Sequence, residues 1–228
     1  LKDDILDYDL YLYNMDHMEL VGAEKDMIAS PRLDNITSVS ALLDTMCKTE
    51  KGNCINVISL FDNEEIGSRS KQGADSVMLS GIVDRIMSGL DMEENDRMRI
   101  MREAFMLSLD VAHATHPNYP EKSDPTNQIV MGCGVALKSS ASQRYVSDSE
   151  ASAVVMALAR KNDINVQRQV NRSGMAGGQT LGPIASSYLP VRAVDMGIPI
   201  LAMHSAMELG SVADYSQLKA LCSAVFEM

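Results

Sequence analysis

Residues 54–67, CINVISLFDNEEIG, place a strand-like run directly before a cluster of acids. Residues 55–60 are rich in β-branched and apolar side chains, which is typical of a buried central strand. Asp62, Glu64 and Glu65 follow at the carboxyl end of this predicted strand. Open α/β sheets bind ligands at the carboxyl ends of their strands, and buried carboxylates need a cation or hydrogen bonds. The segment therefore predicts either a ligand site or a polar loop with its acids in water.

An acid or a histidine follows an extended stretch at three other places. Residues 105–109 predict a core strand that ends at Asp110, and residues 198–202 predict a strand that leads to His204. Asp34 lies where an extended stretch passes into a helix with apolar residues at helical spacing. Asp34 is therefore either the N-cap of that helix or a metal ligand at a strand-to-helix junction.

Strands and helices alternate along the whole chain. Apolar residues at helical spacing predict helices over about residues 75–90, 93–101, 149–161 and 214–226. Further strands are predicted over residues 9–13, 129–137, 166–170 and 191–195. This alternation favours an α/β protein, with three layers, α/β/α, around a mostly parallel central sheet. We expect residues 1–228 to form a single domain.

Composition limits the partners of the chain. A formal net charge of −11 argues against nucleic acid or an anionic membrane as the main partner. No apolar run reaches the ~18 residues that a membrane span needs. The four cysteines form no CxxC pair and lie in apolar segments, so we expect buried, reduced thiols in a cytoplasmic protein.

The four strand-end positions together fit a metal centre. Carboxylates with an imidazole form a ligand set suited to Zn²⁺, Mn²⁺ or Co²⁺. A carboxylate that bridges two ions, with one further acid on each, is the arrangement of two-metal hydrolases. A second glutamate beside a ligand glutamate is the usual general base of such centres. No single spacing here is diagnostic, and the signal lies in four positions that each follow a strand.

Six stretches of the chain resemble the aspartyl aminopeptidases, a family of dinuclear zinc aminopeptidases. They follow the order of the family and span nearly the whole sequence: SPRLDN at residues 30–35, DNEEIGSRSKQGA at 62–74, DVAHATHPNYPEK at 110–122, SQRY at 142–145, GGQTLGPIA at 177–185 and LAMHSAMELG at 201–210. The resemblance implies a zinc-aminopeptidase α/β/α fold. Residues 1–228 would be the carboxyl-terminal part of the catalytic domain, without the amino-terminal segment and the inserted dimerisation domain of the family.

The resemblance implies a role for each predicted site residue. Asp34 would bridge two zinc ions. Glu65 and His204 would bind one of these ions, and Asp110 would bind the other. Glu64 would be the catalytic general base.

The activity implied by the resemblance is that of a zinc metalloaminopeptidase in the cytosol, which releases N-terminal Asp or Glu from peptides and assembles into a homo-oligomer. Lys138 matches a basic position that would bind the acidic side chain, and its alternative is a solvated surface lysine. His113, close after Asp110, is expected to point into the substrate cleft. Residues 123–127 and Gly174 depart from the family pattern, which leaves open a related dinuclear aminopeptidase of other specificity.

The family has one more histidine ligand, in the amino-terminal part that precedes the resemblance. Without it, the ion on Asp110 would keep two carboxylates and water, fewer protein ligands than zinc generally has. We therefore expect one zinc ion or none in this chain, against two in the family, with tight binding only at Asp34, Glu65 and His204. The alternative function is a non-catalytic metal-binding fragment, inactive by itself.

Overall fold

A four-stranded mixed sheet forms the centre of the fold. The computed structural model describes residues 4–50, 52–175 and 177–228. The strands lie in the order β3 (Phe105–Leu109), β7 (Arg192–Gly197), β5 (Val135–Ser139) and β6 (Val166–Val170). β3 pairs with β7 and β5 pairs with β6 in parallel, whereas β5 and β7 are antiparallel.

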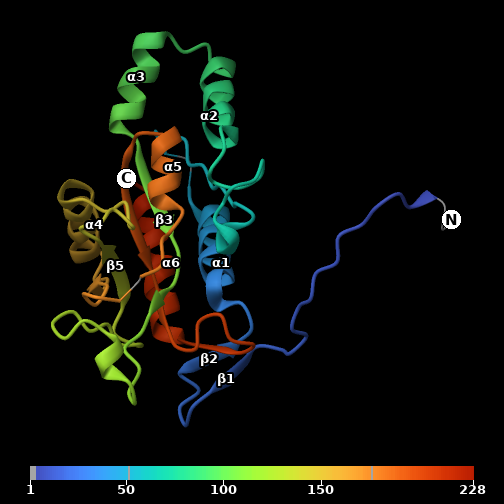
Figure 1. Ribbon diagram of the computed structural model, residues 1–228. Helices are drawn as coiled ribbons and strands as arrows, with labels where there is room; N and C mark the ends of the chain where they lie inside the picture. The colour runs from blue at the N-terminus through green and yellow to red at the C-terminus, as the bar shows by residue number, and fades with distance from the viewer. Residues whose placement is uncertain (1–3, 51, 176) are drawn as a thin grey trace.

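Two smaller sheets extend this arrangement (Figure 1). β1 (Glu19–Val21), β2 (Met27–Ser30) and β9 (Glu208–Ser211) form an antiparallel sheet in that order. β4 (Ala112–His113) and β8 (Pro199–Ile200) pair in parallel just beyond β3 and β7. Because β3 and β7 run in the same direction, the segments that follow them leave the sheet at the same end.

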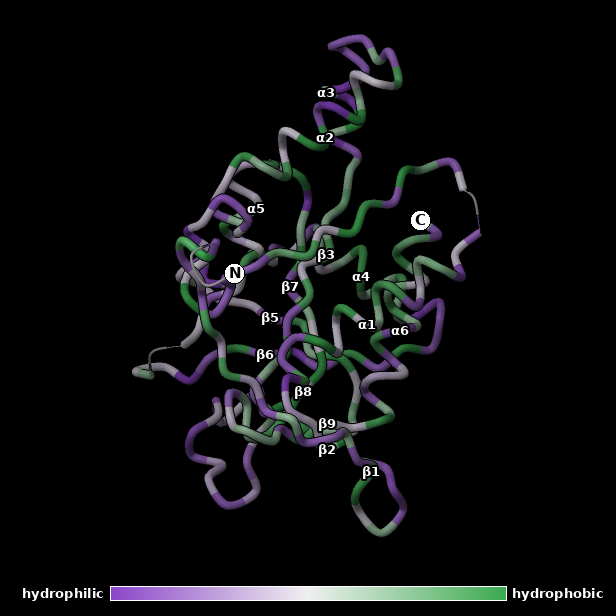
Figure 2. Tube along the Cα trace, turned by 90° about the vertical axis from the view of Figure 1, so that its right-hand side faces the viewer, coloured by the Kyte–Doolittle hydropathy of each residue, from purple (hydrophilic) through white to green (hydrophobic). Residues whose placement is uncertain are grey.

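Helices lie on both sides of the four-stranded sheet. Figure 2 shows α1 (Leu33–Lys48), α4 (Ser149–Lys161) and α6 (Val212–Phe226) on one side, and α5 (Gly182–Tyr188) on the other. In Figure 1, α2 (Met78–Gly89) and α3 (Glu94–Glu103) project beyond the sheet as a pair. Single turns of 3-10 helix occur at η2 (Glu64–Ile66) and η3 (Pro120–Lys122).

The core lies between the sheet and helices α4 and α6. Leu137 of β5 and Met196 of β7 are fully buried in one cluster with Val155 of α4 and Leu218 and Leu221 of α6. Burial of each such side chain contributes about 1.5–3 kcal/mol to stability. Four consecutive residues of β5 are buried, as expected for a central strand that is covered on both faces.

A buried carboxylate fixes the start of α6 against the loop before β5. Asp214 has no exposed surface, and its two oxygens accept hydrogen bonds from the backbone N–H of Gly132 (2.6 Å) and Gly134 (2.7 Å). Gly134 has a φ of +108°, and a Cβ there would lie 2.3 Å from the carbonyl oxygen of Asn165. The loop therefore needs both this glycine and the carboxylate that binds it.

The predicted α/β class is confirmed, and the predicted bounds of β3, α4 and β6 agree with the structure. Their apolar patterns are local and self-contained, so sequence periodicity was enough to locate them. The sheet contains parallel and antiparallel pairs. The full three-layer, mostly parallel arrangement stays a prediction.

The predicted strands at residues 9–13 and 55–60 are wrong in this structure. Both segments are irregular, and no described strand pairs with either. Leu12 is fully exposed, and Ile55 and Val57 are 58% and 45% exposed. A buried strand needs neighbours that bind its backbone and cover its side chains. Apolar composition therefore did not determine burial at these two segments.

All four cysteines are free, but only Cys222 is buried, whereas Cys47, Cys54 and Cys133 are exposed, so the prediction of buried thiols is wrong for three of them. Among the described helices, none has the length and apolar character needed to cross a membrane.

Replacement of Asp214 by alanine should destabilise the fold strongly. The change leaves two buried backbone N–H groups without acceptors, each at a cost of about 1–3 kcal/mol. We expect urea denaturation to show a free energy of unfolding lower by roughly 3 kcal/mol. Asp84→Ala, at an exposed position of α2, is the control and should change this free energy by at most ~0.5 kcal/mol. Equal effects of the two substitutions would contradict the anchoring role of Asp214.

Candidate metal centre

Three side chains that could bind a metal ion lie together at one place in the molecule. Asp34, Glu65 and His204 each offer one donor atom, and these atoms all lie within 4.8 Å of one another. The Nε2 atom of His204 lies 3.1 Å from Oδ2 of Asp34 and 3.2 Å from Oε2 of Glu65. Two carboxylates and an imidazole are a donor set that zinc commonly uses.

The spacing of the donors fits a tetrahedral zinc ion. Bonds of about 2.0–2.1 Å at tetrahedral angles separate neighbouring donor atoms by roughly 3.3 Å. The observed separations of 3.1 and 3.2 Å are close to this value. They are longer than the ~2.7–2.9 Å of a charge-assisted hydrogen bond between nitrogen and carboxylate. The geometry therefore fits an ion shared by the three groups better than direct pairing.

Asp34 reaches the centre because the start of α1 is irregular. Arg32 has a left-handed backbone, with φ +62°, and Asp34 and Asn35 depart from helical backbone angles. The side-chain amide of Asn35 donates a hydrogen bond to the carbonyl oxygen of Leu109 at 2.7 Å, which ties this turn to the end of β3. Arg32 occupies the N-cap position, and no side chain in the described part of the molecule caps the helix, so the interpretation of Asp34 as the cap is wrong.

The other two donors come from tight turns. Glu65 lies in η2, which is flanked by left-handed residues, Asn63 with φ +60° and Gly67 with φ +99°. His204 follows β8 and is itself left-handed, with φ +67°. Non-glycine residues in this conformation are held by their surroundings. All three donors therefore depend on backbone turns that local helix or strand propensity does not favour.

The centre concentrates negative charge. Burial raises the pKa of Asp34 to about 8, with further contributions from the charges of Asp110 and Glu65. Burial, followed by the charge of Asp110, raises the pKa of Glu64 to about 7. Carboxyl groups packed together resist ionisation unless a cation neutralises them. A divalent ion would supply that neutralisation, so the charge of the site as well as its spacing fits a metal.

Asp110 faces the same centre but is paired with a lysine. Oδ2 of Asp110 lies 3.2 Å from Nζ of Lys138, whose ammonium also lies 5.5 Å from the centre of the Tyr145 ring. Lys138 is only 2% exposed, so the interpretation of Lys138 as a solvated surface lysine is wrong. The structure therefore groups Asp34, Glu65 and His204 as donors. Asp110 lies beside them and is paired with the buried ammonium of Lys138.

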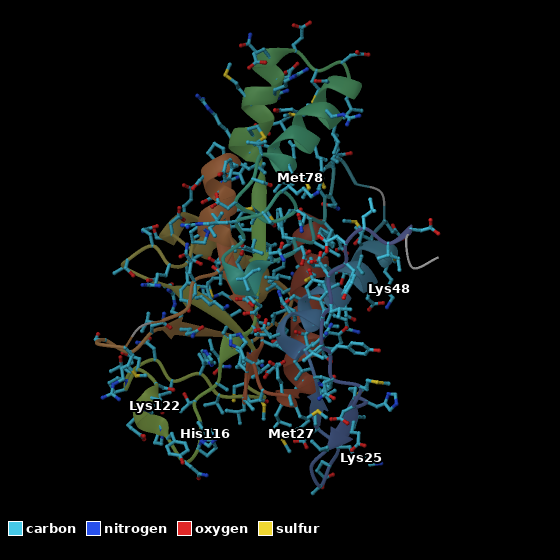
Figure 3. The ribbon with its side chains drawn as sticks, turned by 45° about the vertical axis from the view of Figure 1, so that its right-hand side comes forward. Lys25, Met27, Lys48, Met78, His116 and Lys122 are labelled. Carbon is cyan, nitrogen blue, oxygen red and sulfur yellow. The ribbon has the colours of Figure 1, made fainter. Side chains whose placement is uncertain are left out.

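The histidines near Asp110 differ in their surroundings. Partial desolvation, followed by the charges of His204 and Lys138, lowers the pKa of His113, so His113 lies close to the centre. His116 lies on the outer loop that also carries Lys122 (Figure 3). Nδ1 of His116 accepts a hydrogen bond from the backbone N–H of Asn118 at 3.1 Å. His116 is therefore engaged within its own loop.

Glu64 points to a different space from its neighbour Glu65. It lines a cavity of about 470 Å³ between η2 and the start of α5, together with Arg69, Thr180 and Ile184. The hydroxyl of Thr180 in this lining is buried. Of these two adjacent glutamates, Glu65 therefore belongs to the donor cluster, whereas Glu64 lines a cavity that is large enough for part of a ligand.

Two buried acids near the centre, Glu208 and Asp195, were not among the residues predicted from the sequence. Glu208 accepts backbone hydrogen bonds from Asp34 and His204. Asp195 of β7 accepts hydrogen bonds from the Ser108 hydroxyl and from the backbone N–H of Val146, and burial raises its pKa. Glu208 lies inside the stretch LAMHSAMELG, and an acid four residues after a candidate ligand was the available signal.

Comparison with known proteins gives consistent matches along the chain. Residues 1–226 match the family model described as aminopeptidase I zinc metalloprotease (M18). A probable M18 family aminopeptidase 2 from Clostridium novyi is 45% identical over 212 residues, 93% of this chain and 49% of that protein. The corresponding protein from Mycobacterium leprae is 34% identical over 98% of this chain and 52% of its own length. The chain therefore spans about half the length of these curated relatives.

Solved structures have the same fold. The structure of the Ape4 and Nbr1 complex superposes with a TM-score of 0.89 and 32% identity, over 93% of this chain and 41% of that chain. The S. cerevisiae mApe1 dodecamer gives a TM-score of 0.79 and 27% identity, over 94% of this chain and 49% of that chain.

The donor cluster predicts a single tightly bound zinc ion per chain. After loading and extensive dialysis, elemental analysis should find one equivalent of zinc. His204→Gln should weaken zinc binding by more than the ~10–100-fold typical of supporting residues, because it removes a donor itself. His17→Gln, at an exposed histidine outside the cluster, should leave zinc affinity unchanged. Two retained equivalents would show that another set of donors exists.

Proposed function

The chain belongs to the aminopeptidase I zinc metalloprotease family (M18), and we propose that it carries the zinc-binding part of an aminopeptidase that releases N-terminal Asp or Glu from peptides. The main support is the grouping of Asp34, Glu65 and His204, with Glu64 directly before Glu65 in the chain. This combination offers metal donors and a separate carboxylate for proton transfer, the two requirements of metal-assisted peptide hydrolysis. The preference for acidic residues is the finer part of the proposal and rests on Lys138.

Glu64 and Glu65 would divide the chemistry between them. Asp34, Glu65 and His204 would hold a zinc ion, which when bound would supply a Lewis acid for the peptide carbonyl and for water. Glu64 lines the neighbouring cavity, where its carboxylate can take a proton from the attacking water. The same carboxyl group then donates this proton to the nitrogen of the leaving peptide as the C–N bond breaks.

Lys138 would select the acidic side chain of the substrate. Its ammonium is buried beside Asp110, and its positive charge also acts on Glu64. A buried cation attracts an anionic substrate group and gives no comparable interaction with a neutral one. His113, which lies near Asp110, His204 and Lys138, would be the second substrate contact.

A second zinc ion and a homo-oligomer are further parts of the proposal. Asp34 would bridge the two ions and Asp110 would bind the second, an arrangement supported by the effect of the Asp110 charge on Asp34. The second ion would need another donor from outside the three-residue cluster. The similar mApe1 protein is a dodecamer, which supports an oligomeric form of this protein.

Glu64→Gln should separate metal binding from catalysis. Loss of a positioned general base typically lowers turnover by about 10²–10⁴-fold. We expect this loss on an aspartyl chromogenic substrate, together with unchanged zinc content by elemental analysis. Glu94→Gln, at an exposed glutamate of α3, is the control and should have normal turnover.

Two results would contradict these roles. Loss of zinc in Glu64→Gln, with retention of zinc in Glu65→Gln, would exchange the roles of the two glutamates. Absence of turnover by the zinc-loaded wild-type chain, beside an active Clostridium novyi relative, would favour the non-catalytic metal-binding alternative.

Lys138→Met should change substrate preference more than overall activity. Removal of the buried cation should lower kcat/KM for aspartyl and glutamyl substrates by at least ~10-fold more than for a leucyl substrate. Lys122→Met, on the outer loop that also carries His116, should leave all three values unchanged (Figure 3). An equal loss of kcat/KM on acidic and neutral substrates would show that Lys138 does not select the substrate side chain and serves only as the partner of Asp110.

A further inference from the structure

One buried carboxylate binds the backbone of two of the three candidate donors. Glu208, the first residue of β9, is 2% exposed. Its Oε1 atom accepts a hydrogen bond from the backbone N–H of His204 at 2.7 Å, and its Oε2 atom accepts one from the backbone N–H of Asp34 at 2.9 Å. Glu208 and Asp34 are 174 positions apart in the sequence. The side chain therefore links the start of α1 to the turn that carries His204.

Glu208 is well placed to hold these two segments rigidly. Its backbone is fixed by the β2–β9 pairing, in which Glu208 lies opposite Ser30. The next residue, Leu209, exchanges backbone hydrogen bonds with Leu201 at 2.8 and 3.0 Å, which closes the base of the turn around His204. The carboxylate thus extends from a paired strand into a turn whose base is closed by backbone hydrogen bonds.

Both segments that Glu208 binds need such support. Ala202 and His204 have left-handed backbones, with φ of +57° and +67°, and the left-handed Arg32 comes two residues before Asp34. Such residues are strained and persist only when the surrounding structure holds them. Charge-assisted hydrogen bonds to a buried carboxylate are about twice as strong as those between neutral groups, so Glu208 can supply this support.

We propose that Glu208 is a positioning residue of the metal centre, which fixes the backbones of Asp34 and His204 so that their side chains meet at one ion. We assign it no role as a metal donor, because it lies outside the three-donor cluster and its two oxygens are directed at the backbone N–H groups of Asp34 and His204. Hydrogen-bonding residues behind metal ligands commonly change metal affinity by 10–100-fold. This inference rests on the proposed zinc centre and adds a residue that controls its geometry.

Glu208→Gln is the sharpest test because it preserves the size of the side chain. The amide nitrogen cannot accept a hydrogen bond, so one of the two backbone N–H groups loses its acceptor. Glu208→Asp keeps the charge but shortens the side chain by one methylene, so it cannot span both N–H groups. The two variants together separate the loss of negative charge from the loss of side-chain length. Glu208→Asp remains informative if Glu208→Gln does not fold.

Asp214→Asn provides a matched control. Asp214 is also a buried carboxylate whose two oxygens accept backbone hydrogen bonds, from Gly132 and Gly134, but it lies outside the donor cluster. Its replacement should lower the stability of the metal-free protein to a similar extent as Glu208→Gln. A general loss of stability should therefore affect both variants, whereas a positional effect on the centre should affect only the variants of Glu208.

The measurements are zinc affinity by competition with a chelator, the visible absorption spectrum with Co²⁺ in place of zinc, and urea denaturation of the metal-free protein. Both Glu208 variants should bind zinc about 10–100-fold more weakly than wild type, with an altered Co²⁺ spectrum. Asp214→Asn should bind zinc within about threefold of wild type, with an unchanged spectrum.

Three outcomes would overturn the inference. Glu208 variants with wild-type zinc affinity and spectrum would show that Glu208 does not position the donors, while the zinc centre itself would stand. An equal loss of affinity in Asp214→Asn would assign the effect to general stability. A wild-type protein that fails to bind zinc would overturn the proposed zinc centre, and the role of Glu208 with it.

Discussion

Repulsion between carboxylates is the constraint on which the arrangement of this molecule depends. Burial raises the pKa of Asp34 and of Glu64, and the negative charges of Asp110 and Glu65 raise both pKa values further. A fold tolerates such a cluster only when other groups fix the acids in place and a cation balances them. The ammonium of Lys138 provides part of that balance at Asp110. The spacing of the donor atoms of Asp34, Glu65 and His204 fits a metal ion, which would supply the remaining positive charge.

The parts of the fold that sequence predicted well are those whose environment is encoded locally. β3, α4 and β6 have apolar patterns that match their burial, and their predicted bounds agree with the structure. Residues 55–60 have an equally apolar pattern but no described strand beside them, and Ile55 and Val57 are exposed. Periodicity reports which side chains are suited to burial, whereas burial itself depends on neighbours that a local pattern does not contain.

The candidate centre was predictable in part for a different reason. Parallel strands that leave a sheet at one end bring together the residues that follow them, and this rule predicts that Asp110 and His204 lie close together. Glu208 was not predictable in this way. Its importance comes from two hydrogen bonds to backbone N–H groups, one of them from a residue 174 positions away, and an acid at the start of a short strand has no distinctive pattern. A residue that positions metal-binding side chains by accepting hydrogen bonds from their backbone is recognised only once the fold is known.

The three donors also lie far apart along the chain, in α1, in η2 and in the turn before β9. In an unfolded chain, bringing them together would require closing two long loops, with the loss of entropy that loop closure entails. The site therefore exists only when the amino-terminal and carboxyl-terminal segments of the chain have both docked. An ion that binds only this assembled state raises its population by mass action. The metal would consequently stabilise only chains in which both segments have docked, because a chain with either segment misplaced has no site for the ion to occupy.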